Sequence, residues 1–360
     1  LRRVLALRVH TGSEIRTVYT AMHGVGGRTI LQVMGAAGHF DVHPVEAQQV
    51  PDGDFPTVHF PNPEEPGAMD LALAEAAKVG AELVIANDPD ADRLAVALPG
   101  ADGQWSMLSG DEVGVLLAED LLTHGQQGPD RLVATTIVSS SLLHRIAASH
   151  GAKSKETLTG FKWIATAAMD HPGPFVVGYE EALGYSIGDV VRDKDGVSAA
   201  LLLVDLAAWA KSRGETLRDR LADIYRRHGL HRTRQISVRM EGDTGAARIA
   251  SITKELRANP PAEIAGARVC RIRDIQAGTD TDIQTGEVRP VDLPVSDVLA
   301  LYLDDDSRVL VRPSGTEPKI KFYFEAVISM GEGESVGAVQ ARADVRIDAL
   351  AGALRAILGL

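Results

Sequence analysis

Three aspartates at alternate positions are the strongest chemical signal in the sequence. Asp88, Asp90 and Asp92 directly follow residues 82–86, a short apolar run of the kind found in buried strands. Ligands of open α/β sheets bind at the carboxyl ends of strands, so a bent loop here can bring the three carboxylates together. Such a group repels itself unless a cation neutralises it, and all-oxygen ligation with room for phosphate or water suits Mg²⁺. The sequence therefore favours a magnesium site over a solvated acidic turn, and it lacks the helix pair and the twelfth-position Glu of an EF-hand.

A second loop, residues 312–319, offers several phosphate ligands between two strand-like runs. An arginine binds phosphate oxygens in a bidentate manner, hydroxyls and glycine-freed backbone N–H groups donate further hydrogen bonds, and a lysine adds a point charge. The alternative is a tight hairpin that binds nothing. The candidate phosphate-binding residues are Arg312, Ser314, Gly315, Thr316 and Lys319.

Two weaker signals accompany other predicted strands. Glu180 and Glu181 come after the apolar run 175–177 and could accept hydrogen bonds from sugar hydroxyls, with an exposed acidic turn as the alternative. Lys162 lies among aromatic and apolar residues in Thr159-Gly160-Phe161-Lys162-Trp163. A lysine desolvated in this way can exchange a proton near neutral pH, whereas a surface lysine that only lays its stem on the aromatic rings is the alternative.

The elements that must position these loops alternate between strand and helix. Apolar runs predict strands at 15–20, 82–86, 131–138 and 175–177, and helical spacing predicts helices at 28–37, 68–79, 111–124 with Asp111 as N-cap, 139–150 and 198–211. This alternation predicts an α/β fold with two related units, each a parallel sheet covered by helices on both faces. Beyond residue 234 several strands and a final alanine-rich helix predict a smaller α+β unit.

Turn-rich segments divide the chain into predicted domains. The segment at 125–129 separates the two α/β units, and a second change of pattern lies near 231–234. The predicted domains are a metal-loop domain at 15–128, a sugar-binding domain at 129–232 and a phosphate-binding C-terminal domain at 233–360, after a helix at 1–14 that is expected to be the remnant of a preceding domain.

Composition narrows the range of partners. The net charge of −12 disfavours nucleic acid, which needs a basic face, but allows a local basic pocket for a phosphorylated small molecule. No apolar run approaches the ~18–20 residues that span a bilayer. Cys270 is the single cysteine and lies in an alternating, strand-like run, which indicates a structural role and a reducing compartment. We therefore expect a cytoplasmic protein with no nucleic-acid or membrane partner, and the sequence indicates no oligomeric state.

Taken in order, the four loops resemble those of the α-D-phosphohexomutases, the phosphoglucomutase and phosphomannomutase family. The resemblance extends over essentially the whole chain and rests on Asp88-Pro89-Asp90-Ala91-Asp92-Arg93, Thr159-Gly160-Phe161-Lys162, Glu180-Glu181-Ala182-Leu183-Gly184 with Lys194-Asp195-Gly196, and Arg312-Pro313-Ser314-Gly315-Thr316. The family has four domains around a cleft, three of them related α/β domains. This chain resembles the second, third and fourth.

The resemblance implies two phosphoryl transfers, from a phosphoserine to a sugar phosphate and back to the serine from the bisphosphate. It implies Mg²⁺ held by Asp88, Asp90 and Asp92, and glucose 1,6-bisphosphate or the matching sugar bisphosphate as activator. Arg93 would help hold the moving phosphate and Lys162 would assist proton transfer. Glu180, with Glu181 beside it, would bind sugar hydroxyls, and the 312–319 loop would grip the phosphate that is not reacting.

Two features depart from the family pattern. The motif that carries the catalytic serine, Thr-Ala-Ser-His-Asn-Pro or a close variant, does not precede residue 15, and Ala148-Ser149-His150 is expected to end a helix instead. Little or no turnover is therefore expected from these residues alone. Ala182 replaces a serine of many members, a variant that resembles bacterial phosphoglucomutase/phosphomannomutases and pentose-phosphate mutases, so glucose, mannose and ribose phosphates all remain open as substrates.

The sequence has two alternative interpretations. A phosphatase of the haloacid dehalogenase type also places aspartates after a strand, but its Asp-x-Asp pattern continues differently and leaves the Arg312 loop unexplained. A non-catalytic sugar-phosphate-binding protein is the second alternative, because the serine motif is not found.

Overall fold

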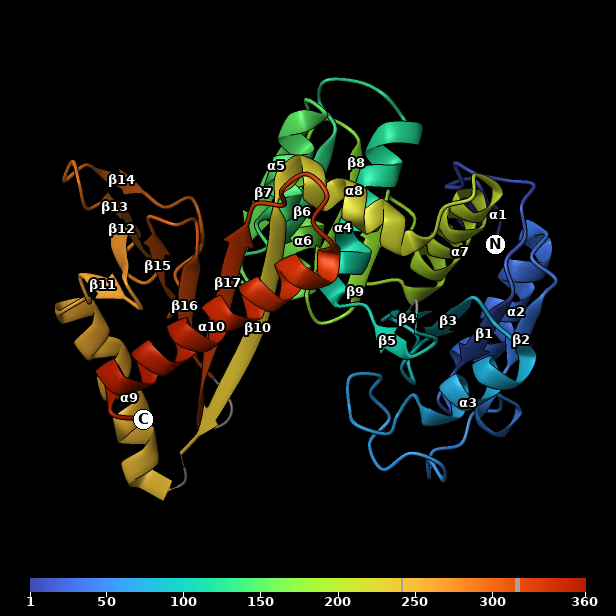
Figure 1. Cartoon of the computed structure of the whole chain (residues 1–360), viewed down its shortest axis with the longest axis horizontal. Helices are drawn as coiled ribbons and strands as arrows, with labels where there is room; N and C mark the ends of the chain where they lie inside the picture. Colours follow the sequence, from blue (N-terminus) through green and yellow to red (C-terminus); the bar gives the residue numbers. More distant parts are fainter. Residues whose placement is uncertain (101, 241, 315–317) are drawn as a thin grey trace. The chain divides into compact units, whose positions relative to one another are not determined.

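The computed structural model describes residues 1–100, 102–240, 242–314 and 318–360. Contacts group them into two compact units, Leu1–Asp223 and Ile224–Leu360. Figure 1 shows two sheets in the first unit and one large sheet in the second. The predicted fold class, two related α/β sheets followed by an α+β part, is confirmed. The domain boundaries at 128 and 232 stay predictions.

The first sheet has the strand order β2-β1-β3-β4-β5. β1 pairs in parallel with β2 and β3, whereas β3–β4 and β4–β5 are antiparallel. The prediction of a wholly parallel sheet is wrong for β4 and β5. β3 leads into β4 through the metal loop, residues 88–93, rather than through a crossover helix. The strands are β1 (Thr17–Thr20), β2 (Val42–Pro44), β3 (Leu83–Ala86), β4 (Ala95–Pro99) and β5 (Trp105–Met107).

The second sheet repeats this arrangement with the order β7-β6-β8-β9. β6 is parallel to β7 and β8, and β9 is antiparallel to β8. The sugar loop, residues 180–184, joins β8 to β9 as the metal loop, residues 88–93, joins β3 to β4, so each sheet carries its loop on a connection between two antiparallel strands. The strands are β6 (Leu132–Thr136), β7 (Lys153–Thr157), β8 (Phe175–Glu180) and β9 (Gly184–Ile187).

One apolar helix packs against both sheets. α7 (Gly196–Ser212) is buried along nearly its whole length and contacts β3 of the first sheet and β9 of the second. A helix that is apolar all round is stable only when it is buried, and α7 meets this condition between two sheets. The other helices of this unit are α1 (Arg2–Leu5), α2 (Gly26–Ala37), the 3₁₀ turn η1 (Glu46–Gln48), α3 (Asp70–Val79), α4 (Gly110–His124), α5 (Leu142–Ser149) and α6 (Phe161–Asp170), and α8 (Leu217–His228) leads into the second unit.

Helix α4 begins one residue earlier than predicted. Its N-cap is Ser109, whose hydroxyl accepts from the Glu112 N–H while the Glu112 side chain accepts from the Ser109 N–H. This capping box satisfies two of the N–H groups that a helix start leaves unpaired. The predicted N-cap Asp111 lies inside the helix, where its carboxylate accepts from the Ser140 N–H at 2.7 Å.

The N-terminal segment, residues 1–14, contains the four-residue helix α1 and is fixed by polar contacts. Arg8 makes two hydrogen bonds of 2.7 Å to the buried carboxylate of Asp205 on α7. His39 Nε2 lies 2.8 Å from the same carboxylate. The segment is thus anchored to the centre of the first unit.

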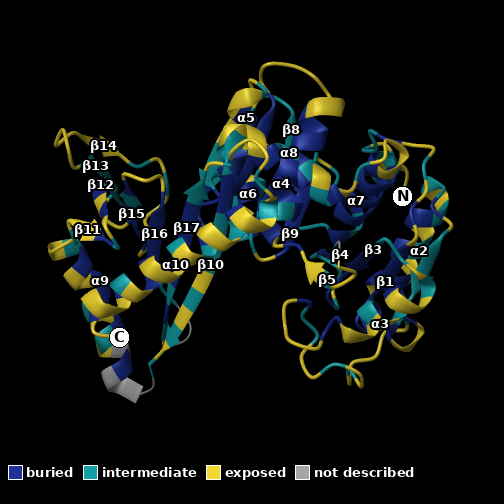
Figure 2. Cartoon of the chain, in the orientation of Figure 1, coloured by how far each residue is buried: buried dark blue, intermediate teal, exposed yellow. Residues whose placement is uncertain are grey.

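The second unit is an antiparallel sheet with two helices. Its elements are β10 (Leu230–Arg239), α9 (Gly242–Ala258), β11 (Glu263–Ile264), β12 (Ala267–Asp274), β13 (Thr279–Asp282), β14 (Val288–Pro290), β15 (Leu299–Leu303), β16 (Arg308–Pro313), β17 (Lys319–Ile328) and α10 (Val336–Leu358). Buried positions recur at helical spacing along α10, which contacts β10 and β17, and Figure 2 shows exposed positions between them. Within the described residues no helix combines the length and apolar character needed to cross a bilayer.

Candidate active site

The metal loop follows β3 directly, and its three aspartates converge as predicted. Carboxylate oxygens of Asp88, Asp90 and Asp92 all lie within 4.8 Å of one another. Ala91 has a φ of +60°, a left-handed conformation that costs a non-glycine residue about 1–3 kcal/mol. This conformation bends the chain between Asp90 and Asp92. The all-oxygen donor set and the close approach of three carboxylates fit Mg²⁺.

Two glycines let neighbouring backbone approach this loop closely. A Cβ on Gly24 would lie 2.3 Å from Pro89 Cα, and a Cβ on Gly196 would lie 2.4 Å from the Arg93 carbonyl oxygen. The Val25 N–H also donates to the Pro89 carbonyl at 2.8 Å. The segments that lead into α2 and α7 therefore hold the metal loop in place.

Two cations balance the charge of the loop. Arg93 donates its Nε–H to Asp88 Oδ2 at 2.5 Å and its backbone N–H to Asp88 Oδ1 at 3.1 Å. Lys194 Nζ lies 2.8 Å from Asp92 Oδ2. Burial raises the pKa of Asp88 more than Arg93 lowers it. Burial alone would lower the pKa of Lys194, but the carboxylates of Asp92, Asp193 and Glu180 together outweigh burial and raise it.

The sugar loop is joined to the metal loop by backbone contacts. Arg93 forms an isolated antiparallel bridge with Gly184, and the Leu94 N–H donates to the Leu183 carbonyl at 3.0 Å. Leu183 has a φ of +64°, so each loop contains one left-handed, non-glycine residue. The structure thus brings the predicted metal ligands and the predicted sugar ligands together from separate sheets.

The two glutamates of the sugar loop have different surroundings. Glu180 Oε1 accepts from the Gly160 N–H at 2.7 Å, which ties the sugar loop to the loop that precedes Lys162. Glu181 Oε2 accepts from the Ser139 hydroxyl at 2.8 Å and from the Thr136 hydroxyl at 3.1 Å. Side chains of β6 and of the segment after it therefore already hold Glu181. Of the two, Glu180 is the better candidate for a ligand of the sugar.

Lys162 differs from its predicted environment. It is exposed on α6, with its Nζ 5.1 Å from the centre of the Trp163 ring. The prediction that apolar neighbours desolvate this lysine is wrong, because Lys162 is exposed and its ammonium contacts the Trp163 ring from the surface of α6. Its role in proton transfer stays a prediction.

The phosphate loop belongs to the second unit and is described by itself. Arg312 is the penultimate residue of the strand β16, and Ser314 follows that strand. Lys319 is the first residue of β17. The Ser314 N–H donates to the Lys319 carbonyl at 2.9 Å, so the segment closes an antiparallel hairpin. The predicted ligands Gly315 and Thr316 lie outside the described residues. Phosphate binding by this loop stays a prediction.

The half-buried carboxyl of Glu180 makes the stability of the fold depend on pH. Burial raises its pKa above the ordinary value. A raised pKa stabilises the fold below the unfolded value of about 4.3, and this contribution is lost as pH rises through the folded pKa. Glu180→Gln keeps the acceptor for Gly160 and removes the titration, so we expect its unfolding midpoint to exceed the wild-type midpoint at pH 8 and this gain to shrink toward pH 4. Urea unfolding at both pH values measures it, and a gain that is equal at pH 4 and pH 8 would contradict the assignment.

Comparison with known families agrees with this arrangement. The chain matches the model of "Phosphoglucomutase/phosphomannomutase, alpha/beta/alpha domain II" over residues 3–101, that of domain III over residues 109–228, and that of the C-terminal domain over residues 271–343. The chain belongs to the phosphoglucomutase/phosphomannomutase family.

Relatives of this chain include proteins named as a phosphomannomutase and as phosphoglucomutases. It is 43% identical over 327 residues to a Haemophilus influenzae protein named "Probable phosphomannomutase", covering 91% of this chain and 63% of the relative. It is 36% identical to a Staphylococcus epidermidis phosphoglucomutase over 86% of this chain and 57% of the relative. A Burkholderia thailandensis phosphoglucomutase/phosphomannomutase family protein has the same fold, with a TM-score of 0.66 at 21% identity, over 99% of this chain and 63% of that one. This chain thus spans about three fifths of the length of these proteins.

Several residues of the candidate site were not identified from the sequence. Lys194 was noted only as part of a motif, yet it pairs with Asp92. Ser139 and Thr136 hold Glu181 but carry no sequence signal of their own. Ser149 does end α5, as expected, and its hydroxyl donates to the Ile146 carbonyl, so it shows no feature of a catalytic serine.

Proposed function

We propose that this chain supplies the metal, sugar and phosphate loops of a Mg²⁺-dependent phosphohexomutase that interconverts hexose 1-phosphate and hexose 6-phosphate. The observation that carries the proposal is the convergence of Asp88, Asp90 and Asp92 on a loop bonded directly to the sugar loop. A metal held there would meet the phosphoryl end of a sugar whose hydroxyls reach Glu180. We further propose a cytoplasmic location, with sugar phosphates as the partners.

Residues of the chain have separate tasks in this proposal. Mg²⁺, when bound by Asp88, Asp90 and Asp92, would neutralise charge on the phosphoryl group in transit. Arg93 is held beside Asp88 and would contact the same phosphoryl oxygens. Glu180 would accept hydrogen bonds from two neighbouring sugar hydroxyls and so fix the orientation of the ring. Lys162, on a water-exposed helix start, would exchange a proton with the sugar oxygen that gains or loses the phosphoryl group.

The phosphate of the sugar that is not being transferred must also be bound. Arg312, Ser314, Gly315, Thr316 and Lys319 would grip this phosphate through charge-assisted hydrogen bonds while the other end reacts. The bisphosphate intermediate must then be bound in two orientations, because the phosphate returned to the serine is the one that was not transferred. Glucose 1,6-bisphosphate or its sugar counterpart would prime the serine by donating one phosphate.

The phosphoryl donor is the element that these 360 residues do not supply, because no Thr-Ala-Ser-His-Asn-Pro motif occurs among them. We propose that these residues by themselves bind sugar phosphates and do not turn them over. The test uses two proteins, the chain alone and the chain fused behind the serine domain of a homologous mutase. Each is given Mg²⁺, catalytic glucose 1,6-bisphosphate and the 1-phosphates of glucose, mannose and ribose in parallel. Turnover by the chain alone would overturn the serine argument, and no turnover by the fusion would overturn the mutase proposal.

Asp90→Asn is the matched variant for the metal site, because Asp90 is exposed and its substitution is expected to leave the fold intact. We expect calorimetric titration to show at least about tenfold weaker Mg²⁺ binding, and the fusion protein to lose turnover with it. Asp54→Asn, an exposed aspartate outside the loop, should leave Mg²⁺ binding unchanged. If Asp90→Asn and wild type bound Mg²⁺ with equal affinity, the proposal that the metal binds in this loop would be contradicted.

A pentose-phosphate substrate is the second candidate, because Ala182 is a variant shared by hexose and pentose mutases and leaves both substrates open. The sugar loop carries Ala where many family members carry Ser, and one hydroxyl contact to the sugar is lost. The ribose 1-phosphate arm of the assay decides between the two, since a pentose mutase would prefer it over both hexose 1-phosphates.

A further inference from the structure

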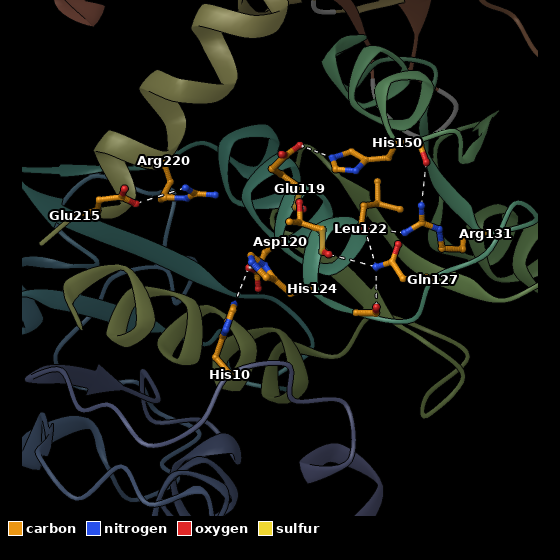
Figure 3. Close-up of polar contacts among 12 residues, drawn as sticks. His10, Glu119, Asp120, Leu122, His124, Gln127, Arg131, His150, Glu215 and Arg220 are labelled. Atoms are coloured by element: carbon orange, nitrogen blue, oxygen red, sulfur yellow. Dashed lines mark hydrogen bonds and ion pairs between the residues drawn. The ribbon is translucent and has the colours of Figure 1, made fainter. Parts of the chain in front are cut away.

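A second cluster of metal-binding side chains lies away from the metal loop, within the first unit. It consists of His10 in the N-terminal segment and Asp120 and His124 on α4. His10 Nε2 lies 2.8 Å from Asp120 Oδ1, and His124 Nδ1 lies 3.0 Å from the same oxygen. The candidate ligand atoms of all three residues lie within 4.8 Å of one another. Figure 3 shows His10 approaching Asp120, with His124 beside it on the same helix.

The structure positions these three side chains rigidly. Asp120 and His124 are four residues apart on one helix and therefore share one face of it. The Trp209 ring of α7 stacks on His10 at 4.5 Å between centroids and meets His124 edge to face at 4.8 Å. His10 and Asp120 are buried, whereas the side chain of His124 is 30% exposed. Rings locked by packing in this way make a preorganised ligand set.

The chemistry of this cluster differs from that of the metal loop. Two imidazole nitrogens and one carboxylate are the ligand set of Zn²⁺ and related transition metals, whereas Mg²⁺ selects oxygen ligands. We propose that His10, Asp120 and His124 bind one divalent transition-metal ion of the Zn²⁺ class, independently of the function proposed above. Three protein ligands leave a fourth position for water or a small anionic ligand.

An entry path leads to the cluster through a cavity of about 830 Å³ that His124 lines together with Leu7 and Phe175. Binding needs no net loss of protons from neutral rings. His10 would move its proton from Nε2 to Nδ1, and His124 from Nδ1 to Nε2, so that each nitrogen now facing Asp120 offers a lone pair to the metal. The nearby guanidinium groups of Arg213 and Arg220 lie against Trp209, and Arg220 is paired with Glu215 at 3.4 Å.

Metal binding would connect two parts of the sequence that are far apart. His10 belongs to the N-terminal segment, and Asp120 lies 110 positions later on α4. A metal between them would fasten the segment to the helix that begins beside the sugar loop. Because unfolding separates the ligands, the metal should also stabilise the first unit in proportion to its occupancy.

The test is a calorimetric titration of the full chain with Zn²⁺, in an excess of Mg²⁺ that occupies the metal loop. We expect one Zn²⁺ per chain, with affinity at least about tenfold lower in His124→Gln and in Asp120→Asn. The control is His43→Gln, which changes another histidine paired with an aspartate at 2.8 Å and should leave Zn²⁺ affinity unchanged. Far-UV circular dichroism verifies that each variant is folded. No Zn²⁺ binding by the wild type, or equal binding by His124→Gln, would overturn the proposal.

The fluorescence of Trp209 gives a second measurement of metal binding. It would not change if His10, Asp120 and His124 had only a structural role. Co²⁺ bound by the cluster would lie next to Trp209 and quench its fluorescence, whereas Trp105 and Trp163 lie on other elements. Trp209→Phe should remove the Co²⁺-dependent quenching while Zn²⁺ still binds in the calorimeter. Quenching that persists undiminished in Trp209→Phe would place the ion elsewhere and contradict the site.

Discussion

Replacing Arg93 with methionine should lower the free energy of unfolding of the metal-free first unit by about 3–5 kcal/mol. Asp88 is only 2% exposed at its side chain, and the Arg93 Nε–H at 2.5 Å is its main positive partner. Without the Arg93 guanidinium, the Asp88 carboxylate keeps the backbone N–H of residue 93 but is buried without a counter-charge. All three tryptophans, Trp105, Trp163 and Trp209, belong to the first unit, so urea unfolding followed by tryptophan fluorescence in EDTA measures the loss there.

The loss caused by Arg93→Met should depend on pH and on Mg²⁺. Burial already raises the pKa of Asp88, and the removal of Arg93 raises it further. A carboxyl with a raised pKa stabilises the fold below its unfolded value of about 3.9, and this contribution is lost as pH rises, so the deficit should be smaller at pH 5 than at pH 8. Saturating Mg²⁺ should also reduce the deficit, because the cation replaces the lost charge.

The matched control for Arg93→Met is Arg16→Met. Arg16 pairs with Asp41 at 3.0 Å on the surface of the same unit, and an exposed pair contributes only about 0–1 kcal/mol. A variant Arg93→Met that is as stable as wild type in EDTA at pH 8 would show that Asp88 has no need of this partner. It would also remove the argument that a cation is required in the loop.

The chemistry of each loop could be predicted from the sequence because it is local. Asp88, Asp90 and Asp92 share one short segment after an apolar strand, and alternate spacing was enough to indicate a shared ligand. Glu180 likewise followed a recognisable strand. The structure confirms that the three aspartates converge and that the metal loop is bonded to the sugar loop.

The contacts that could not be predicted join residues far apart in the sequence. Lys194 reaches Asp92 only because α7 packs between the two sheets. The left-handed conformation of Ala91 gives no sign in the sequence, since alanine is not a residue that favours it. β4 was also missed, because its short apolar run after the metal loop resembles a buried loop segment as closely as a strand.

For Lys162 the predicted burial of the side chain was wrong. Its aromatic and apolar neighbours in the sequence suggested burial, but a helix places successive residues on different faces. On α6 Phe161 and Ile164 face the core, and Lys162 between them points to solvent. The period of the helix, rather than the average composition of the segment, decides which side chain is buried.

The second large effect is expected at Asp205, at the centre of the first unit. Asp205→Asn should lower the free energy of unfolding by about 3–5 kcal/mol. The amide keeps nearly the same shape and still offers His39 a carbonyl oxygen, but it leaves the partly buried guanidinium of Arg8 without a counter-charge. Urea unfolding followed by tryptophan fluorescence measures the loss, with wild type as reference.

A double-mutant cycle distinguishes the loss of the Arg8–Asp205 ion pair from a loss of packing. Arg8→Met removes the guanidinium, so Arg8→Met combined with Asp205→Asn leaves no charge buried at this position. The double variant should therefore be more stable than Asp205→Asn alone, although it carries one more substitution. Losses that simply add would mean that Arg8 and Asp205 act independently. In that case the N-terminal segment would be held by its apolar contacts, and the ion pair would not be what fixes residues 1–14 to α7.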